Sequence, residues 1–209
     1  MIVRPYCRIK GSSAELPATA VKTMANAGAN SSSTGPPTIT SQTRSMRTVP
    51  QVVLFGLIGG DWREQQVIPV LTELHVTYYN PVQPLGWTHQ SGDVEAEYMA
   101  GCETVVMVFN RTSPGFAALA EVGWAAAGCL ERNQHFILQI DLDFPLHLPP
   151  ELTALPAGAQ LEKALQGWTT RSRYLVYKHA CQFKHPRMHI VEDVPAVVTE
   201  LRKIYGSRE

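Results

Sequence analysis

Short apolar runs alternate with helix-like segments through most of the chain. Continuous, β-rich runs without a polar alternate position are typical of strands covered on both faces. Five such runs are predicted strands: 51–58, 75–79, 104–109, 135–140 and 188–191. Apolar spacing, acidic first turns and terminal glycines predict four helices between and after them: 64–74, 93–100, 117–127 and 194–205. The helix at 64–74 contains Pro69, so it either starts late or kinks there.

Strands that alternate with helices indicate a parallel sheet with right-handed crossovers. Five strands fit an α/β flavodoxin-like three-layer sandwich with the strand order 2-1-3-4-5, in which ligands bind beyond the carboxyl ends of strands 1 and 3. The segments 59–63, 80–97 and 110–121 each follow a predicted strand. We therefore expect these three segments to lie at one edge of the sheet. The proline-rich stretch 141–156 predicts a loop, 161–167 one or two helical turns, and 174–184 no definite element.

The first 48 residues differ in composition from the rest. They are rich in Ser, Thr, Ala, Gly and Pro and hold six Lys or Arg against one acidic residue, Glu15. Such a segment is typical of a disordered tail, and its basic, acid-poor character also fits an organelle transit peptide or a docking arm. We therefore place the folded domain at residues 49–209 and expect an intracellular, cytoplasmic protein unless the tail directs it to an organelle.

Charge and hydrophobicity indicate which partners to expect, and the cysteine spacing indicates the redox state of the thiols. The formal net charge is zero, which leaves the part after the tail mildly acidic and argues against nucleic acid as a partner. No apolar run approaches the roughly 20 residues that span a bilayer, so no membrane partner is expected. The four cysteines show no paired spacing, which favours reduced thiols.

Glu121 is the first candidate for chemistry because it lies among alanines that cannot solvate its charge. It is either a functional carboxylate or a structural one that pairs with Arg63 or Arg111. Two carboxylates in one cleft suit cleavage of a glycosidic bond. The segment before strand 3 offers three partners, Asp93, Glu95 and Glu97. On a helix Asp93 and Glu97 share one face, while Glu95 points away from both.

Further side chains at the same edge are candidates for substrate contacts. Gly59 and Gly60 either let the backbone approach a ligand or simply make a tight turn. Each of Trp62 and Trp87 either stacks on a nucleobase or packs in the core. Polar contacts to a sugar or base are expected from these residues: Asp61, Arg63, Asn80, Asn110 and Ser113. Trp124, three residues after Glu121, is expected in the core, where it would desolvate the carboxylate.

Four potential metal ligands lie close together near the C-terminus: His179, Cys181, His185 and His189. Pro186 interrupts the helix that an H-x-x-x-H pair would use, and no second cluster of acids or thiols accompanies them. We therefore expect no metal, and the glycosidic chemistry requires no organic cofactor.

Three motifs together resemble the nucleoside 2-deoxyribosyltransferase family, particularly its deoxyribosyltransferase-like branch. They are the strand and loop Val-Leu-Phe-Gly-Leu-Ile-Gly-Gly-Asp-Trp-Arg at 53–63, Tyr-Asn-Pro at 79–81, and Glu-Val-Gly-Trp-Ala-Ala at 121–126. The resemblance covers about residues 51–140. It implies that Glu121 attacks C1′ of a 2′-deoxynucleoside and forms a covalent deoxyribosyl-enzyme. It also selects Glu95, eight residues before Glu103, as the acid that assists the departing base.

The resemblance further implies a nucleoside or nucleotide and a free nucleobase as substrates, and a homo-oligomer as the assembly. Many family members carry Asp or Ser six residues before the nucleophile, where this chain has Gly115 with Ser113 and Thr112 as the nearest polar residues. The function expected is transfer at the N-glycosidic bond. Two alternatives remain open: hydrolysis, in which water replaces the acceptor base, and a nucleotide-binding sensor that kept the fold without turnover.

Overall fold

A computed structural model of the chain describes residues 48–82 and 86–207. The predicted tail at 1–48 lies almost wholly outside these residues, as do residues 83–85 of the predicted loop at 82–92. The described strands are β1 (Val52–Gly56), β2 (Tyr78–Tyr79), β3 (Thr104–Phe109), β4 (His135–Ile140) and β5 (Met188–Val191). The helices are η1, a π-helical segment (Trp62–Val67), α1 (Ile68–Glu73), α2 (His89–Gly101), α3 (Phe116–Glu131), α4 (Pro150–Thr153), α5 (Gly158–Ala180) and α6 (Val194–Tyr205).

The five strands form one parallel sheet with the order β2-β1-β3-β4-β5. Val52 is in register with Thr104 of β3, which is in register with His135 of β4. All six residues of β3 are buried. The predicted α/β flavodoxin-like fold and strand order are therefore confirmed.

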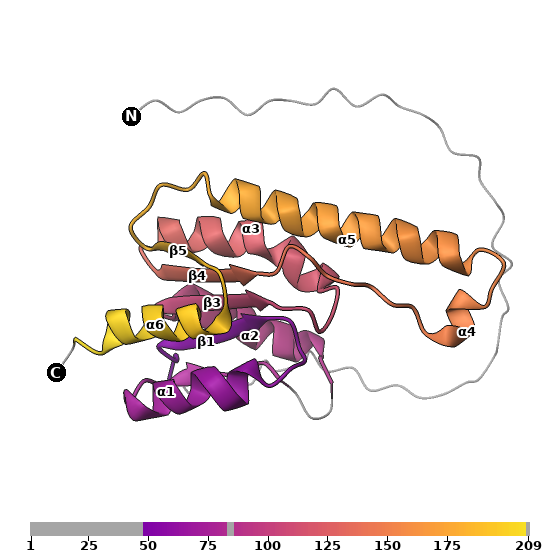
Figure 1. Cartoon of the computed structure of the whole chain (residues 1–209). Coiled ribbons are helices and arrows are strands. Elements are labelled where there is room, and N and C mark those ends of the chain that lie inside the picture. Colours follow the sequence, from indigo (N-terminus) through magenta and orange to yellow (C-terminus); the bar gives the residue numbers. More distant parts are fainter. Residues whose placement is uncertain (1–47, 83–85, 208–209) are drawn as a thin grey trace, which may run out of the picture. The chain divides into compact units, whose positions relative to one another are not determined.

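Helices cover both faces of the sheet (Figure 1). On one face, η1, α1 and α6 enclose a core that contains Leu54, Trp62, Leu71 and Leu201. On the other face, α2, α3 and α5 pack over a core that contains Met107 and Phe136 and is closed by the small inward residues of α3. These two layers leave the carboxyl ends of β1, β2 and β3 free to carry loops.

Pro69 explains why the first crossover begins with a π-helical segment. Proline has no N–H to donate to the preceding turn, and the six residues of η1 lie directly before α1, which holds Pro69 near its start. The predicted helix 64–74 is thus two helical pieces that begin at Trp62. This early start turns Trp62 and Arg63 toward the core.

Three other boundaries differ from the predictions. His75 adopts a positive φ of 54°, so the strand predicted from 75 is reduced to the two residues of β2. Helix α2 begins at His89 instead of Asp93, because the hydroxyl of Thr88 caps it by accepting from the Ser91 N–H at 3.1 Å. Helix α3 runs on past Gly128 to Glu131, since a glycine inside a helix costs only about 1 kcal/mol.

The largest difference is α5, a single helix of 23 residues where the sequence predicted one or two helical turns at 161–167 and no definite element at 174–184. Its inward face carries Thr169 and Arg173, both fully buried, where an amphipathic helix would carry apolar residues. Its outward face instead exposes Leu161, Trp168 and Leu175 at intervals of seven. The apolar stripe therefore points away from the core. Among the described helices, none combines the length and the apolar character needed to cross a membrane.

Candidate functional site

The loops after β1 and β3 meet at the carboxyl edge of the sheet. Gly59 and Gly60 have positive φ angles of 130° and 71°, which L side chains rarely adopt. A Cβ on Gly60 would lie 3.1 Å from both Asn110 Nδ2 and Thr112 Cγ2. The Asn110 Oδ1 atom accepts from the N–H and hydroxyl of Thr112 at 3.0 and 2.6 Å. Gly59 and Gly60 thus allow the loop after β1 to approach the loop after β3 closely.

Asp61, which directly precedes η1, is exposed, but the two residues after it are buried. Trp62 and Arg63 are each 1% exposed, and the Arg63 guanidinium lies 4.2 Å from the centre of the Trp62 ring. Arg63 donates to the carbonyl oxygens of Leu54 at 3.1 Å and Leu57 at 2.8 Å. The expectation that Trp62 and Arg63 contact a substrate is therefore wrong for this structure, in which both hold the end of β1.

The arginines proposed as structural partners of Glu121 are engaged elsewhere. Arg63 donates to backbone carbonyls, as above, and burial lowers the pKa of its guanidinium to about 10. Arg111 lies 3.8 Å from Asp141 and 3.9 Å from Asp143. The structure therefore does not support an ion pair between Glu121 and either arginine.

Glu95 lies on the half-buried face of α2, while Asp93 and Glu97 are exposed. This is the face that the family resemblance selects. Trp87 Nε1 donates to Glu95 Oε2 at 3.3 Å, and the Trp87 ring covers Gly92, where a Cβ would lie 2.7 Å from Cζ2. The pKa of the Glu95 carboxyl is raised, because desolvation outweighs the opposite effect of the Trp87 hydrogen bond. Trp87 is 58% exposed, so its ring is accessible for stacking.

Glu121 projects from the neighbouring helix α3 and is exposed in this structure. Its pKa is nevertheless raised, first by the protein atoms that desolvate it and second by the negative charge of Glu95. Glu95 therefore lies close enough for its charge to affect the ionisation of Glu121. Trp124 does not contribute to this desolvation from the core, because it is 85% exposed. Its predicted core position is wrong.

The orientation of α3 explains the exposure of Trp124. The helix turns Leu119, Val122 and Ala126 toward the sheet. Trp124 lies two residues from both Val122 and Ala126, and two residues correspond to about 200° of rotation on an α-helix. Its side chain is therefore directed to the opposite side, into solvent.

Asn80 and Ser113 are half-buried at the same edge. Asn80 Nδ2 donates to Glu64 Oε1 at 3.1 Å, and its Oδ1 accepts from the Val82 N–H at 3.3 Å. Gly115 caps α3 with a φ of 68°, and a Cβ there would overlap the Leu57 side chain. The Asp or Ser that many family members carry at this position would not fit this backbone without a shift.

Arg173 of α5 is a positioning residue that sequence reasoning missed. Its Nη1 donates to the carbonyl oxygens of Phe109 at 3.1 Å, Asn110 at 2.9 Å and Asp141 at 2.8 Å. Its Nη2 donates to the carbonyl oxygen of Ser113 at 2.8 Å. One buried guanidinium thus joins the ends of β3 and β4 and fixes the loop before α3. The sequence offered no signal that distinguishes Arg173 from Arg171, two residues before it, in a segment without an assigned element.

The structure does not bring the four potential metal ligands near the C-terminus together as one group. His189 Nε2 lies 3.0 Å from His135 Nδ1, and its Nδ1 lies 3.3 Å from Glu200 Oε2. Within residues 48–82 and 86–207, no three His, Cys, Asp or Glu side chains gather in a way that would hold a metal ion. These histidines instead join β4, β5 and α6.

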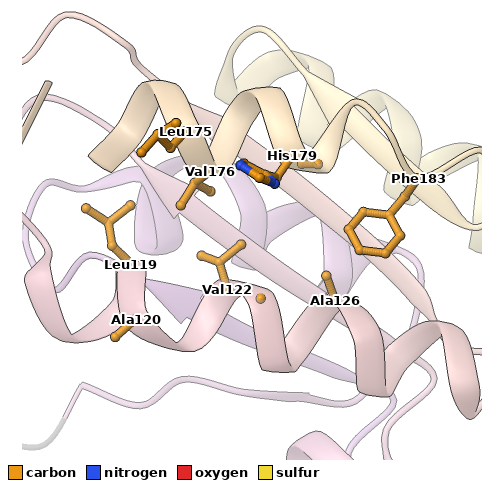
Figure 2. A pocket seen from close by; sticks show the side chains of 10 residues that line it. Leu119, Ala120, Val122, Ala126, Leu175, Val176, His179 and Phe183 are labelled. Atoms are coloured by element: carbon orange, nitrogen blue, oxygen red, sulfur yellow. The ribbon is translucent and has the colours of Figure 1, made fainter. Parts of the chain in front are cut away.

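A pocket of about 270 Å³ lies between α3 and α5 (Figure 2). Leu119, Val122 and Ala126 line it from α3, and Leu175 and Val176 line it from α5. Glu121 and Glu95 do not line it. The two candidate carboxylates lie instead on α2 and α3, which contact each other, and we place the candidate active site there.

The candidate active site consists of two carboxylates and the loops that end β1, β2 and β3. The accessible members of the predicted set are Gly59, Gly60, Asp61, Asn80, Trp87, Glu95, Asn110, Ser113, Gly115 and Glu121. Their contacts with a substrate stay a prediction. Comparison with models of known protein families found no match, and comparison with curated proteins found no relative.

Proposed function

We propose that this domain cleaves the N-glycosidic bond of a nucleoside or nucleotide and passes the sugar to another nucleobase. Glu121 acts as the nucleophile and Glu95 assists the departing base. One observation carries the proposal: α2 and α3 contact each other, burial raises the pKa of Glu121 on α3, and the charge of Glu95 on α2 raises it further. Pairs of carboxyls with perturbed ionisation are typical of glycosidic chemistry.

The two carboxyls account for each bond and each proton that changes in the proposed reaction. A carboxylate oxygen of Glu121 forms a bond to C1′ as the bond from C1′ to the base breaks. The electron pair leaves with the base nitrogen, which takes a proton from Glu95. A nitrogen of the acceptor base then attacks C1′, gives its proton to Glu95 and releases the Glu121 carboxylate.

Substrate binding at Trp87 is expected to change which of the two carboxyls, Glu95 or Glu121, is protonated. In the free protein desolvation raises the pKa of Glu95, and the hydrogen bond from Trp87 acts against this effect. A base that stacks on the exposed Trp87 ring and weakens this bond raises the pKa of Glu95 further. Protonation of Glu95 removes the charge that raises the pKa of Glu121 and so favours the ionised nucleophile.

Incubation with deoxyinosine and free adenine, followed by chromatography, tests the proposal. Deoxyadenosine is the expected product. Glu121→Gln is expected to remove turnover, and Glu95→Gln to reduce it by about 10²- to 10⁴-fold, the usual contribution of a general acid. Glu97→Gln, which changes an exposed carboxylate on the same helix, is the matched control and should retain activity. Full activity in Glu121→Gln would refute the mechanism.

Hydrolysis is the second candidate, and the exposure of Glu121 favours it. Water can reach a sugar carried on an exposed carboxylate and replace the acceptor base. Free deoxyribose in the same assay, with or without adenine, would identify this reaction. Binding of deoxyinosine without any product would identify a sensor, a role that fits a glycine at position 115.

A further inference from the structure

Charge is distributed unevenly over the folded domain. Residues 158–187, which form α5 and the segment that leads to β5, hold six Lys or Arg and one acidic residue. The rest of the domain, 49–157 and 188–209, holds six Lys or Arg and sixteen acidic residues. The one acid near α5, Glu162, is half-buried and accepts from the Leu148 N–H at 3.1 Å. One basic helix thus belongs to an otherwise acidic domain.

The basic side chains of this segment are available to a partner. Four of them are exposed: Lys163, Arg171, Lys178 and Lys184. Among the described residues, none of the four forms an ion pair with a carboxylate. Lys178 lies over the Tyr174 ring, with Nζ 5.4 Å from the ring centre, and this contact leaves its charge unneutralised.

Exposed apolar side chains follow the same helix, which packs against α3 (Figure 1). Leu161, Trp168 and Leu175 are exposed and form one stripe, because seven residues are two helical turns less about 20°. Arg171 and Lys178 each follow a stripe residue by three positions, which places them about 60° from the stripe. We use the name α5 surface for the exposed apolar and basic residues together: Leu161, Lys163, Trp168, Arg171, Tyr174, Leu175, Lys178, Phe183 and Lys184.

The composition of the α5 surface is typical of a helix that lies in the surface of an anionic bilayer. Such helices combine Trp, Phe and Leu with Lys and Arg. Trp and Tyr rings favour the headgroup level, and the basic side chains reach anionic headgroups while their methylene chains stay in apolar surroundings. At 1.5 Å per residue the 23 residues of α5 extend about 34 Å. A bilayer is a plane that can cover this whole length at once.

We propose that the α5 surface binds to the surface of an anionic phospholipid bilayer. The sequence predicted no membrane partner because no apolar run is long enough to span one, but binding at the surface needs no such run. Glu121 does not line the pocket between α3 and α5 and lies near Glu95 of α2. The α5 surface therefore does not include the candidate active site, and the proposal does not depend on the proposed reaction.

Binding of the full chain to lipid vesicles, measured by co-sedimentation, tests the proposal. The parent should bind vesicles with about 30% phosphatidylserine at least tenfold more tightly than vesicles of phosphatidylcholine alone. Each Lys or Arg near an anionic bilayer strengthens binding by about five-fold. Lys163→Glu/Arg171→Glu/Lys178→Glu, the helix variant, loses three attractive charges and gains three repulsive ones. It should bind at least about 100-fold more weakly than the parent.

A variant in the basic N-terminal segment is the matched control. Arg4→Glu/Arg8→Glu/Lys10→Glu makes the same change in net charge outside the α5 surface. It should bind at least about tenfold more tightly than the helix variant. The substituted side chains of α5 are exposed, so circular dichroism should show that the helix variant is folded. Equal weakening in the two variants would mean that binding follows net charge alone, and would overturn the proposal.

Tryptophan fluorescence identifies the side chain that reaches the headgroups. The emission of the parent should shift to shorter wavelength on anionic vesicles, because Trp168 leaves water. Trp168→Phe should lose most of this shift, whereas Trp124→Phe, which changes an exposed tryptophan of α3, should keep it. The opposite pattern would overturn the proposal, as would a parent that binds both kinds of vesicle equally. Binding to polyuridylate or polyglutamate without binding to vesicles would identify a soluble polyanion as the partner and would also overturn it.

Discussion

Glu95 on α2 lies close enough to Glu121 on α3 for its negative charge to raise the pKa of the Glu121 carboxyl. The residues belong to consecutive helices on the same face of the sheet. Glu95 in turn accepts a hydrogen bond from Trp87, which precedes α2. The electrostatic interaction between the two carboxyls therefore depends on the loop that holds Trp87 and on helices α2 and α3. Substitutions can change each of these three parts separately.

Glu95→Gln is expected to lower the pKa of Glu121 toward its ordinary value. The amide keeps the shape of the side chain but carries no charge, so the repulsion that favours protonated Glu121 is lost. Desolvation, the larger cause, remains, and the pKa should therefore stay above the ordinary value. The measurement is a carboxyl ¹³C NMR titration of parent and variant. Glu97→Gln serves as the control, and an unchanged Glu121 midpoint in Glu95→Gln would show that the carboxyls do not interact.

The sheet was predictable because its strands are short apolar runs that have to be buried on both faces. The predicted strands 104–109 and 135–140 match β3 and β4 at both ends. Once the strands and the intervening helices are known, chain order and the handedness of crossovers leave few topologies. The same rules predicted that Gly60 and Asn110 lie at one edge of the sheet. In the structure a Cβ on Gly60 would lie 3.1 Å from Asn110 Nδ2.

The helices were less predictable because the partners of a helical face cannot be read from its own sequence. Thr169 and Arg173 interrupt the inward stripe of α5, since Arg173 is used to bind loop carbonyls. Trp124 was assigned to the core from its spacing to Glu121, but the sheet lies on the other side of α3. Trp62 and Arg63 were expected to face a ligand, and the early start of the π-helical segment turns them inward.

Arg173→Met is expected to destabilise the domain by about 3–5 kcal/mol. The substitution removes a buried donor from four carbonyl oxygens, of which, within the described part of the chain, only that of Phe109 keeps a second donor, the Asp141 N–H. Each group left unsatisfied costs about 1–3 kcal/mol before relaxation. Urea unfolding at one protein concentration measures the change. Arg171→Met, at an exposed position on the same helix, should remain within about 0.5 kcal/mol of the parent. Equal effects of the two substitutions would contradict a positioning role for Arg173.

Hydrogen exchange adds a second measurement for Arg173. If its guanidinium fixes the loop between β3 and α3, amides in residues 110–116 should exchange faster in Arg173→Lys than in the parent. Lysine keeps the charge but cannot bind four separate carbonyls with a planar fork. Faster exchange spread evenly over the whole sheet would instead indicate general destabilisation.

Gly115→Ala is expected to cost about 2–4 kcal/mol of stability. The backbone at Gly115 has a positive φ of 68°, which costs an L residue roughly 1–2 kcal/mol, and the new methyl group would overlap Leu57, which adds the cost of overpacking. Gly123→Ala on the same helix is the matched control, because its Cβ meets open space. That variant should gain about 0.5–1 kcal/mol from helix propensity. A stability loss in both variants, or in neither, would contradict the strain assigned to Gly115.

His189 makes the stability of the β4–β5–α6 contact dependent on pH. Burial lowers its pKa below the ordinary 6.5, and the Lys203 charge adds to this, while Glu200 acts in the opposite direction. The His135 ring stacks on it with centroids 5.3 Å apart. Below about pH 6.5 the unfolded chain therefore binds more protons at this residue than the folded chain does. The free energy of unfolding should fall as the pH decreases from about 7 through 6.5 toward the lowered pKa of His189.

His189→Gln is expected to remove this part of the pH dependence. The amide can still hydrogen-bond to Glu200 but does not titrate. The difference in unfolding free energy between parent and variant should therefore shrink or change in favour of the variant as the pH is lowered from 7.5 to 5.5, measured by urea unfolding at several pH values. His147→Gln, at an exposed histidine, should keep the parent's pH dependence. A difference that grows in favour of the parent at low pH would mean that folding raises the affinity of His189 for its proton, contrary to the desolvation that the structure shows.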